Sequence, residues 1–259
     1  MDSATESVIE VQDLDLGYDD YTVMKDLNFK VNKGDIFIVM GVSGCGKSTL
    51  LKSMIGLKEP GKGKVLFYGK SFWDEDQTGQ QKMMQHFGIL YQKGALWSSL
   101  TVGENVALPL QLYTKLSRQQ IQEIVALKLS LVGLSGYEDF FPSGISGGMS
   151  KRVSLARAIA LDPGIIFFDE PSAGLDPINS RKLDDLILEL RDGLGATIVI
   201  VTHELASIFA IGNNAVFLDQ TSKTMIATGD PKWLLANSKD PRVIQFLKRG
   251  RISDESKGQ

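Results

Sequence analysis

The sequence contains one cysteine, and it has no apolar run approaching the about eighteen residues that a membrane-spanning helix requires. A single cysteine excludes a disulfide within the chain and fits a reducing compartment. The first seven residues, MDSATES, lack the basic start and the apolar stretch of a signal peptide. We therefore expect a cytoplasmic protein that reaches a membrane only through a partner.

An excess of charge of either sign is also missing, because 28 lysines and arginines nearly balance 31 aspartates and glutamates, for a net charge of −3. This balance argues against a broad nucleic-acid-binding surface. The composition, 43% hydrophobic and 23% charged, is typical of a soluble globular protein. The length of 259 residues suits one large domain, or a domain with a subdomain.

A glycine-rich loop is the strongest feature that is present. Residues 41–49 read GVSGCGKST and match the pattern G-x-x-x-x-G-K-[ST], with a strand-like apolar run at 36–40 before them and a helical stretch after them. The glycines let the backbone turn tightly and point its amides inward, and the helix N-terminus adds further donors to an anion site. The candidate phosphate-binding residues are Gly41, Val42, Ser43, Gly44, Cys45, Gly46, Lys47, Ser48 and Thr49.

Three side chains of this loop have predicted roles. Lys47 would reach the β- and γ-phosphates, the Ser48 hydroxyl would ligate Mg²⁺, and Thr49 would lie near the α-phosphate. We expect neither a metal-binding nor a redox role for Cys45, where a small side chain suffices. The alternative is a glycine-rich turn with an incidental lysine.

Alternating and apolar runs predict strands on both sides of the loop. The runs 8–16 and 27–31 precede it and predict an antiparallel β element beside a parallel sheet. The segment 100–133 has a helical period instead, with a capping box at 101–104 and a second helix start at 117, and a further helix is predicted to run to about residue 160. More strands are predicted at 64–68, 87–92, 165–170, 197–203, 215–219 and 225–229.

Several polar residues end the predicted parallel strands, at the sheet edge where ligands bind in open α/β folds. They are Gln92, Asp169, Glu170 and His203. Successive side chains of a strand point to opposite faces, so Asp169 and Glu170 can hold different roles, one toward Mg²⁺ and the other toward an attacking water. Taken singly, Gln92 fits a solvated loop residue equally well.

Two weaker signals complete the set. Ser146 is a predicted helix N-cap, and with Gly147 and Gly148 it would offer amide donors to an anion, although an ordinary cap explains the same residues. Tyr18 can stack on adenine or pack half-buried near its turn, and Tyr21 is the competing candidate.

The ordered set resembles the ATPase subunit of ATP-binding-cassette (ABC) transporters over about residues 7–230. Residues 41–49 are similar to the Walker A motif, 145–149 to the signature motif, 165–170 to Walker B and 172–176 to the D-loop. Gln92 falls at the Q-loop, His203 at the switch histidine and Tyr18 at the adenine-stacking aromatic.

The resemblance implies an α/β fold of the ABC type, a P-loop nucleotide-binding domain. A RecA-like parallel-sheet core with an antiparallel β element would span 7–92 and 162–230, a helical subdomain 93–161, and a C-terminal tail 231–259. It also implies hydrolysis of ATP with Mg²⁺, with Glu170 and His203 catalytic and with Ser48, Gln92 and Asp169 holding the metal. The family works as a homodimer, so Ser146, Gly147 and Gly148 would close over ATP bound by the other protomer.

A closer resemblance concerns the segments 94–102, 146–152 and 240–247, which look like the Mla-type subfamily. Those ATPases serve Mce-protein transporters that move phospholipid between bacterial membranes. This implies an integral-membrane permease and an Mce-domain partner, no nucleic acid, and a place at the cytoplasmic face of the inner membrane. The signature departs from the usual pattern, with Ile145 for leucine and Met149 for glutamine, and we assign the Met149 side chain no role.

Three alternatives stay open. An importer of small polar solutes would share every motif. A non-transport ABC ATPase usually has two cassettes or a long coiled-coil insertion, which this sequence lacks, and a non-catalytic regulatory module would have lost Glu170 or His203. The tail is either an assembly element or a docked C-terminal helix.

Overall fold

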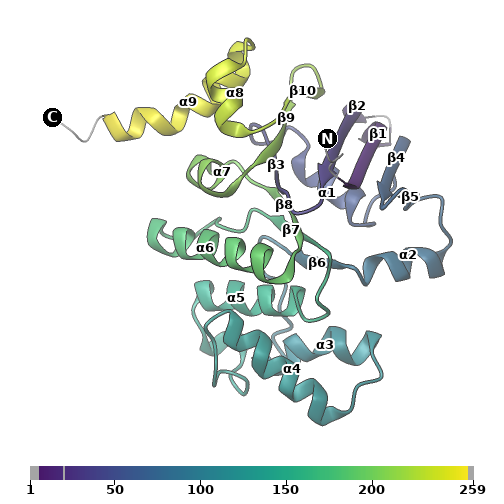
Figure 1. The fold of residues 1–259 in the computed structure, drawn as a ribbon, viewed down its shortest axis with the longest axis vertical. Coiled ribbons are helices and arrows are strands. Elements are labelled where there is room, and N and C mark those ends of the chain that lie inside the picture. The colour runs from purple at the N-terminus through teal and green to yellow at the C-terminus, as the bar shows by residue number, and fades with distance from the viewer. Residues whose placement is uncertain (1–5, 20, 256–259) are drawn as a thin grey trace, which may run out of the picture. The chain divides into compact units, whose positions relative to one another are not determined.

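The computed structural model describes residues 6–19 and 21–255 (Figure 1). These residues form two compact units. One unit contains the described residues up to Met84 together with those from Thr197 onward, and the other is Gln85–Ala196. The α/β fold class is therefore confirmed, with parallel and antiparallel strands as expected. The narrower helical segment expected at 93–161 stays a prediction.

The first unit contains an antiparallel sheet in the order β2-β1-β4-β5. Its strands are β1 (Ser7–Tyr18), β2 (Tyr21–Asn32), β4 (Lys62–Phe67) and β5 (Lys70–Ser71). Alternate residues of β1 such as Ile9 and Val11 are buried, as their spacing predicts. β2 begins six residues before the predicted strand, because the ladder with β1 continues to the Tyr18–Tyr21 pair.

The same unit holds the parallel strands that lead to the phosphate-binding loop. β3 (Ile36–Met40) pairs in parallel with β8 (Thr197–Val201) and β9 (Asn214–Asp219), and β10 (Thr224–Thr228) pairs antiparallel with β9. Every residue of β3 and β8 is buried, which explains their uninterrupted apolar sequences.

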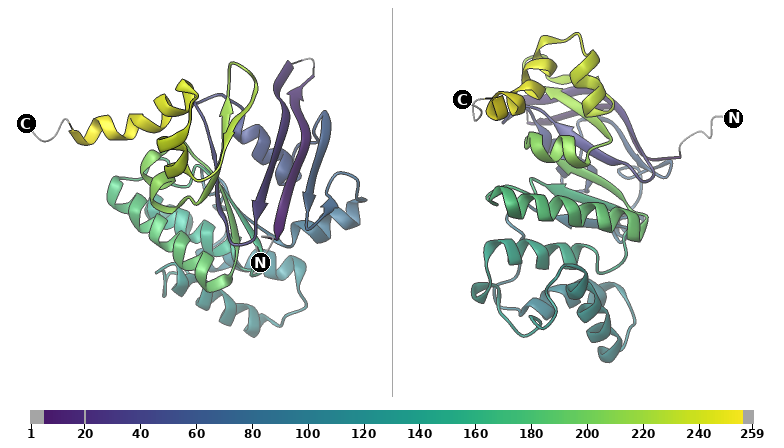
Figure 2. Two further views of the ribbon diagram at one scale, coloured as in Figure 1. Left: turned by 45° about the horizontal axis from the view of Figure 1, so that its top comes forward. Right: turned by 60° about the vertical axis from the view of Figure 1, so that its left-hand side comes forward.

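The described residues of the first unit also form the helices α1 (Lys47–Met54), α2 (Gln77–Met84), α7 (Leu205–Ile211), α8 (Pro231–Asn237) and α9 (Pro241–Glu255). Figure 2 shows α8 and α9, in yellow, beside β9 and β10. Val243 and Leu247 of α9 are fully buried, and Phe246 meets Phe217 of β9 edge to face, with 5.1 Å between the ring centroids. The tail is therefore docked through α9, while its contribution to assembly stays a prediction.

The second unit contains the parallel pair β6 (Phe87–Leu90) and β7 (Ile165–Asp169). Its helices are α3 (Val102–Tyr113), α4 (Arg118–Leu131), α5 (Gly147–Ala158) and α6 (Pro177–Leu194), with a short 3₁₀ turn at Pro142–Gly144. The capping box predicted at Thr101 and Glu104 is confirmed, and a second one joins Ser117 to Gln120. Among the helices of the described residues, none is both long and apolar enough to cross a membrane.

Candidate nucleotide-binding site

The loop between β3 and α1 has a backbone that only glycine accommodates at several positions. Gly44 and Gly46 have φ angles of 80° and 100°, in the left-handed region that side chains disfavour. Gly41 lies so close to the end of β9 that a Cβ atom would stand 2.4 Å from the carbonyl oxygen of Leu218. A Cβ on Gly46 would stand 2.8 Å from the Val23 side chain. The predicted tight turn is therefore present, and its glycines stand where the φ angle or a close neighbour disfavours a side chain.

Lys47 is buried at the first position of α1 and turns back into the loop. Its Nζ atom donates to the carbonyl oxygens of Gly41, at 2.9 Å, and Val42, at 3.1 Å. Gly46 caps α1 without a side-chain hydrogen bond, and the first turn of the helix holds no acidic residue. The ammonium and the N-terminal amides of α1 thus concentrate positive charge in one loop, which suits a polyphosphate.

Cys45 is 1% exposed inside the loop. Burial raises the pKa of its thiol, and the nearby Lys47 ammonium opposes this only in part. A neutral thiol at physiological pH acts here as a small packing group.

His203 reaches the same edge of the sheet as the loop. Val201 of β8 is in register with Val39 of β3, and both His203 and Gly41 follow two residues later. His203 is exposed, so a ligand held by the loop could meet its imidazole.

Tyr18 and Tyr21 are paired residues of the β1–β2 ladder, and both side chains are exposed. The Nζ atom of Lys58 lies 4.1 Å from the centre of the Tyr18 ring, and that of Lys223 lies 4.4 Å from the Tyr21 ring. Each ring thus has a lysine beside it, and the assignment of Tyr18 to adenine stays a prediction.

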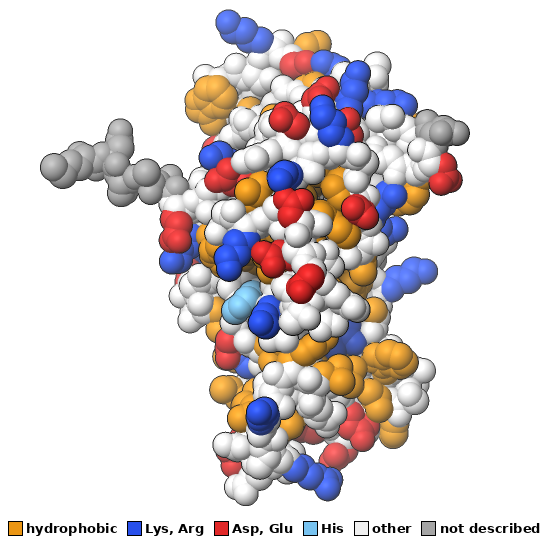
Figure 3. All heavy atoms as spheres, turned by 90° about the vertical axis from the view of Figure 1, so that its right-hand side faces the viewer, with side chains coloured by type: hydrophobic (Ala, Val, Ile, Leu, Met, Phe, Trp, Pro, Cys, Tyr) orange, Lys and Arg blue, Asp and Glu red, His pale blue; other side chains and the backbone are white. Residues whose placement is uncertain are grey.

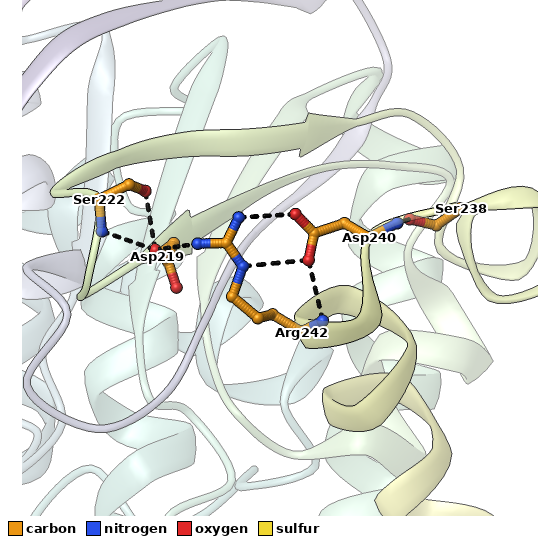
Figure 4. Close-up of polar contacts among 5 residues, drawn as sticks. All are labelled: Asp219, Ser222, Ser238, Asp240 and Arg242. Carbon is orange, nitrogen blue, oxygen red and sulfur yellow. Dashed lines mark hydrogen bonds and ion pairs between the residues drawn. The ribbon is translucent and has the colours of Figure 1, made fainter.

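Asp219 is a charged residue beside the loop that is not among the predicted site residues. It ends β9, directly after Leu218, and its Oδ2 atom accepts hydrogen bonds from the Ser222 amide and hydroxyl and from Arg242 of α9 (Figure 4). Burial favours the neutral acid, but the bonds from Ser222 and the charge of Arg242 outweigh it and hold the pKa of Asp219 below its ordinary value. The rule that selected Asp169, an acid at the end of an apolar strand, would also have found Asp219.

The second unit gathers several of the remaining predicted residues, but not Asp169 or Glu170, around a hollow of about 490 Å³. Ser146 caps α5, accepting a hydrogen bond from the Met149 amide at 3.2 Å, which confirms the predicted cap. The hollow is lined by Gln92, by Ser146, Gly147 and Gly148, and by the segment 173–176. Gln92 itself lies in a turn two residues beyond the end of β6.

The segments on both sides of this hollow are bonded to α5. Arg157 donates to the carbonyl oxygens of Gly94 and Ala95, each at 2.8 Å, and so fixes the turn that carries Gln92. Lys151 donates to the carbonyl oxygens of Pro171 and Ala173. These bonds join residues far apart in the sequence, and no local pattern indicates them.

The two acids at the end of β7 differ from the expectation. Asp169 is the last strand residue, but Glu170 has a φ angle of 47° and has left the strand. The expected alternation of the two side chains along one strand is therefore wrong. A left-handed conformation costs a non-glycine residue about 1–2 kcal/mol. The surrounding structure must hold Glu170 in place against this cost.

The predicted metal ligands Ser48, Gln92 and Asp169 offer a hydroxyl, an amide and a carboxylate oxygen. These hard oxygen donors suit Mg²⁺, which typically takes one or two carboxylates and completes its shell with phosphate and water. Ser48 belongs to the first unit and the other two to the second. In the described part of the chain, no cluster of three or more His, Cys, Asp or Glu forms a protein-only metal site.

A family model described as ABC transporter matches residues 24–173, more than half of the chain. The chain belongs to the ABC transporter family. It therefore binds ATP, and as an ABC ATPase it hydrolyses it.

Similar proteins extend the likeness over most of the chain. The "Intermembrane phospholipid transport system ATP-binding protein MlaF" of Haemophilus influenzae is 39% identical, over 94% of this chain and 91% of that protein. The same-named Escherichia coli K12 protein is 37% identical, over 95% and 91%. The "Probable ribonucleotide transport ATP-binding protein mkl" of Mycobacterium leprae is 39% identical, over 94% and 70%.

Solved ABC structures share the fold. The cbiO1 protein from Clostridium perfringens, part of an ABC transporter complex, has a TM-score of 0.82 at 28% identity, with 97% of this chain and 99% of that chain covered. A dimeric ATP-binding cassette, MJ0796, solved in a post-hydrolysis state with ADP and Pi, has a TM-score of 0.78 at 27% identity, with 86% and 98% covered.

Proposed function

We propose that the chain is the ATP-hydrolysing subunit of a phospholipid transporter at the bacterial inner membrane. It acts as a homodimer on the cytoplasmic face, bound to an integral-membrane permease that works with an Mce-domain protein. The observation that carries this proposal is the likeness to the MlaF proteins, which spans nearly the full length of both chains.

ATP binding uses the residues of the first unit. The amides of 41–49 and the Lys47 ammonium surround the β- and γ-phosphates, and Tyr18 stacks on adenine. His203, placed at the same sheet edge, contacts the γ-phosphate. Mg²⁺, when bound, neutralises phosphate charge, and Ser48, Gln92 and Asp169 would hold it.

Glu170 orients the attacking water and accepts its proton, a role that needs a carboxylate at a fixed place. Ser146, Gly147 and Gly148 at the N-terminus of α5 contact the ATP bound by the other protomer. Shared binding of ATP thereby drives closure of the dimer, and Gln92 and the helices of the second unit transmit that closure to the permease.

The exposed side chains of the second unit support contact with a partner protein. Leu112 and Tyr113 of α3 and Leu127 of α4 are each more than half exposed. On the face drawn in Figure 3, side chains of both charge signs are interspersed with hydrophobic ones. Such a surface suits a protein partner better than a nucleic acid.

The hydrolytic mechanism is tested by Glu170→Gln, which keeps the size of the side chain and removes the carboxylate. ATP still binds, and kcat falls by about 10²–10⁴-fold, the usual worth of a general base. The variant accumulates as an ATP-dependent dimer on size-exclusion chromatography with Mg-ATP. A near wild-type rate would refute the role of Glu170, and an inactive variant that stays monomeric at saturating ATP would refute the shared-site dimer of the isolated chain.

The cargo is tested by purifying the transporter from detergent-solubilised membranes and identifying the bound molecules by mass spectrometry. Phospholipid should be retained, and phospholipid vesicles should stimulate ATP hydrolysis by the complex. The name of the Mycobacterium leprae relative favours ribonucleotide cargo as the second candidate. Stimulation by added ribonucleoside monophosphates, with no retained lipid, would support that candidate and refute ours.

A further inference from the structure

Lys151 lies on α5 within two turns of the Ser146 cap, and its side chain is half-buried. Its Nζ atom donates to the carbonyl oxygen of Pro171, at 2.6 Å, and to that of Ala173. Both carbonyls belong to the short loop that follows Glu170 and leads into α6. One ammonium thus joins the helix that carries Ser146 to the loop that carries Glu170.

Glu170 is followed by a tight turn instead of further strand. Glu170 has a left-handed backbone, and the turn after it is closed by the bond from the Ala173 amide to the Glu170 carbonyl oxygen, at 3.1 Å. A lysine head group normally reaches water, because desolvation of an ammonium is costly. Here burial lowers the pKa of Lys151, and the negative charge of Glu170 opposes that change. Since this half-buried cation donates to two carbonyls of one loop, we expect the conformation of the loop to depend on it.

We propose that Lys151 is a positioning residue for hydrolysis, which holds the loop after Glu170 and thereby the Glu170 carboxylate in its reactive orientation. The proposal rests on the function proposed for Glu170. Since Lys151 and the Ser146 cap share one helix, movement of α5 on contact with the partner's ATP passes to Glu170 through two hydrogen bonds. When Ser146, Gly147 and Gly148 of one protomer contact ATP bound by its partner, the orientation of Glu170 in that same protomer therefore changes.

The test compares Lys151→Met, Lys151→Gln and Lys151→Arg in the full chain with its transporter. Lys151→Met keeps the length of the stem and removes the donors, so kcat falls by about ten- to a hundred-fold, the loss expected from a misplacement near 1 Å. KM for ATP changes by less than about threefold, because the residues that bind ATP are untouched. Lys151→Arg restores most of kcat, and Lys151→Gln, with fewer donors and no charge, gives an intermediate rate.

Lys182→Met is the matched control, because Lys182 is exposed on α6 and lines a second hollow together with Lys151. It should leave both kcat and KM unchanged. Retained ATP binding and an unchanged melting temperature show that each variant is folded, and Lys151→Gln replaces Lys151→Met should the latter fail to fold. The proposal would be overturned by an unchanged kcat in Lys151→Met and Lys151→Gln, or by a rise of KM as large as the fall of kcat. A kcat for Lys151→Arg as low as that of Lys151→Met would overturn it too.

The double variant Lys151→Met with Glu170→Gln separates this proposal from the one on which it rests. If Lys151 acts through Glu170, adding Lys151→Met to Glu170→Gln lowers the residual single-turnover rate by less than about twofold. A full further loss in the double variant refutes positioning through Glu170 and leaves the role of Glu170 intact. A near wild-type rate for Glu170→Gln alone refutes the role of Glu170 itself.

Discussion

Replacing Gly41 with alanine would place a methyl group 2.4 Å from the carbonyl oxygen of Leu218. That oxygen cannot move freely, because Leu218 is fully buried and β9 is paired on one side with β3 and on the other with β10. The nearby Cys45 sulfur would also lie 2.7 Å from the new Cβ. Either the loop must therefore shift away from β9, or the pairing of β9 with β3 and β10 must be distorted.

The expected cost of Gly41→Ala has two sources. Overpacking of a rigid site costs about 1–3 kcal/mol, and a strained backbone conformation costs about 1–3 kcal/mol more. We expect a loss of about 2–6 kcal/mol in the free energy of unfolding if the loop keeps its place. If it shifts instead, less stability is lost, but the amides of 41–49 no longer converge and the affinity for ATP falls.

Gly34→Ala is the control, because Gly34 also has a left-handed φ angle, of 77°, and among the described residues only its chain neighbours lie within 4 Å of an added Cβ. It should cost about 1–2 kcal/mol and leave ATP binding unchanged. Urea unfolding and titration with a fluorescent ATP analogue measure both quantities. Gly41→Ala with the stability of Gly34→Ala and normal ATP affinity would refute the steric argument.

Three further predictions concern the first unit. Tyr18→Ala should raise KM for ATP with little loss of kcat, since stacking contributes uniform binding, and the same effect from Tyr21→Ala alone would show that the wrong ring was assigned. Phe246→Ala should lower the free energy of unfolding, measured with urea, by up to about 3–5 kcal/mol, because Phe246 is buried against Phe217. The control Gln245→Ala, at an exposed position, should lower it by almost nothing, and equal stabilities of the two variants would contradict the docking of α9. Because its pKa is lowered, ionised Asp219 stabilises the folded state at pH values above the unfolded pKa of about 3.9, and this stabilisation is lost as the pH falls through the folded pKa. Asp219→Asn should therefore lose less stability than the wild type below about pH 4. Parallel pH profiles of the two proteins would contradict this prediction.

Short-range chemistry made much of this molecule predictable. Gly44 and Gly46 have the positive φ angles that the loop pattern requires, and the Thr101 box closes as the sequence indicates. The burial of β3 and β8 follows directly from their apolar sequences. Helix α6 was not predicted, although Asp176, Pro177 and Gly195 mark its two ends.

Other features depend on contacts between distant segments and lie beyond local patterns. The left-handed turn at Glu170 breaks the strand period although the residue type does not demand it. The bonds of Lys151 and Arg242 each join segments about twenty residues apart in the sequence, and a lysine or arginine alone does not indicate its acceptor. The lysines beside the Tyr18 and Tyr21 rings also come from distant segments, and neither tyrosine indicates its lysine in the sequence.

The first unit is assembled from two distant stretches of chain, with Gln85–Ala196 lying between them in sequence. During translation, β3 therefore leaves the ribosome long before β8 and β9, the strands that pair with it. The second unit is contiguous and can fold first. We expect stalled nascent chains that end before Thr197 to carry the complete glycine-rich loop and yet bind no ATP, so that the part of the protein made early becomes functional only at the end of synthesis.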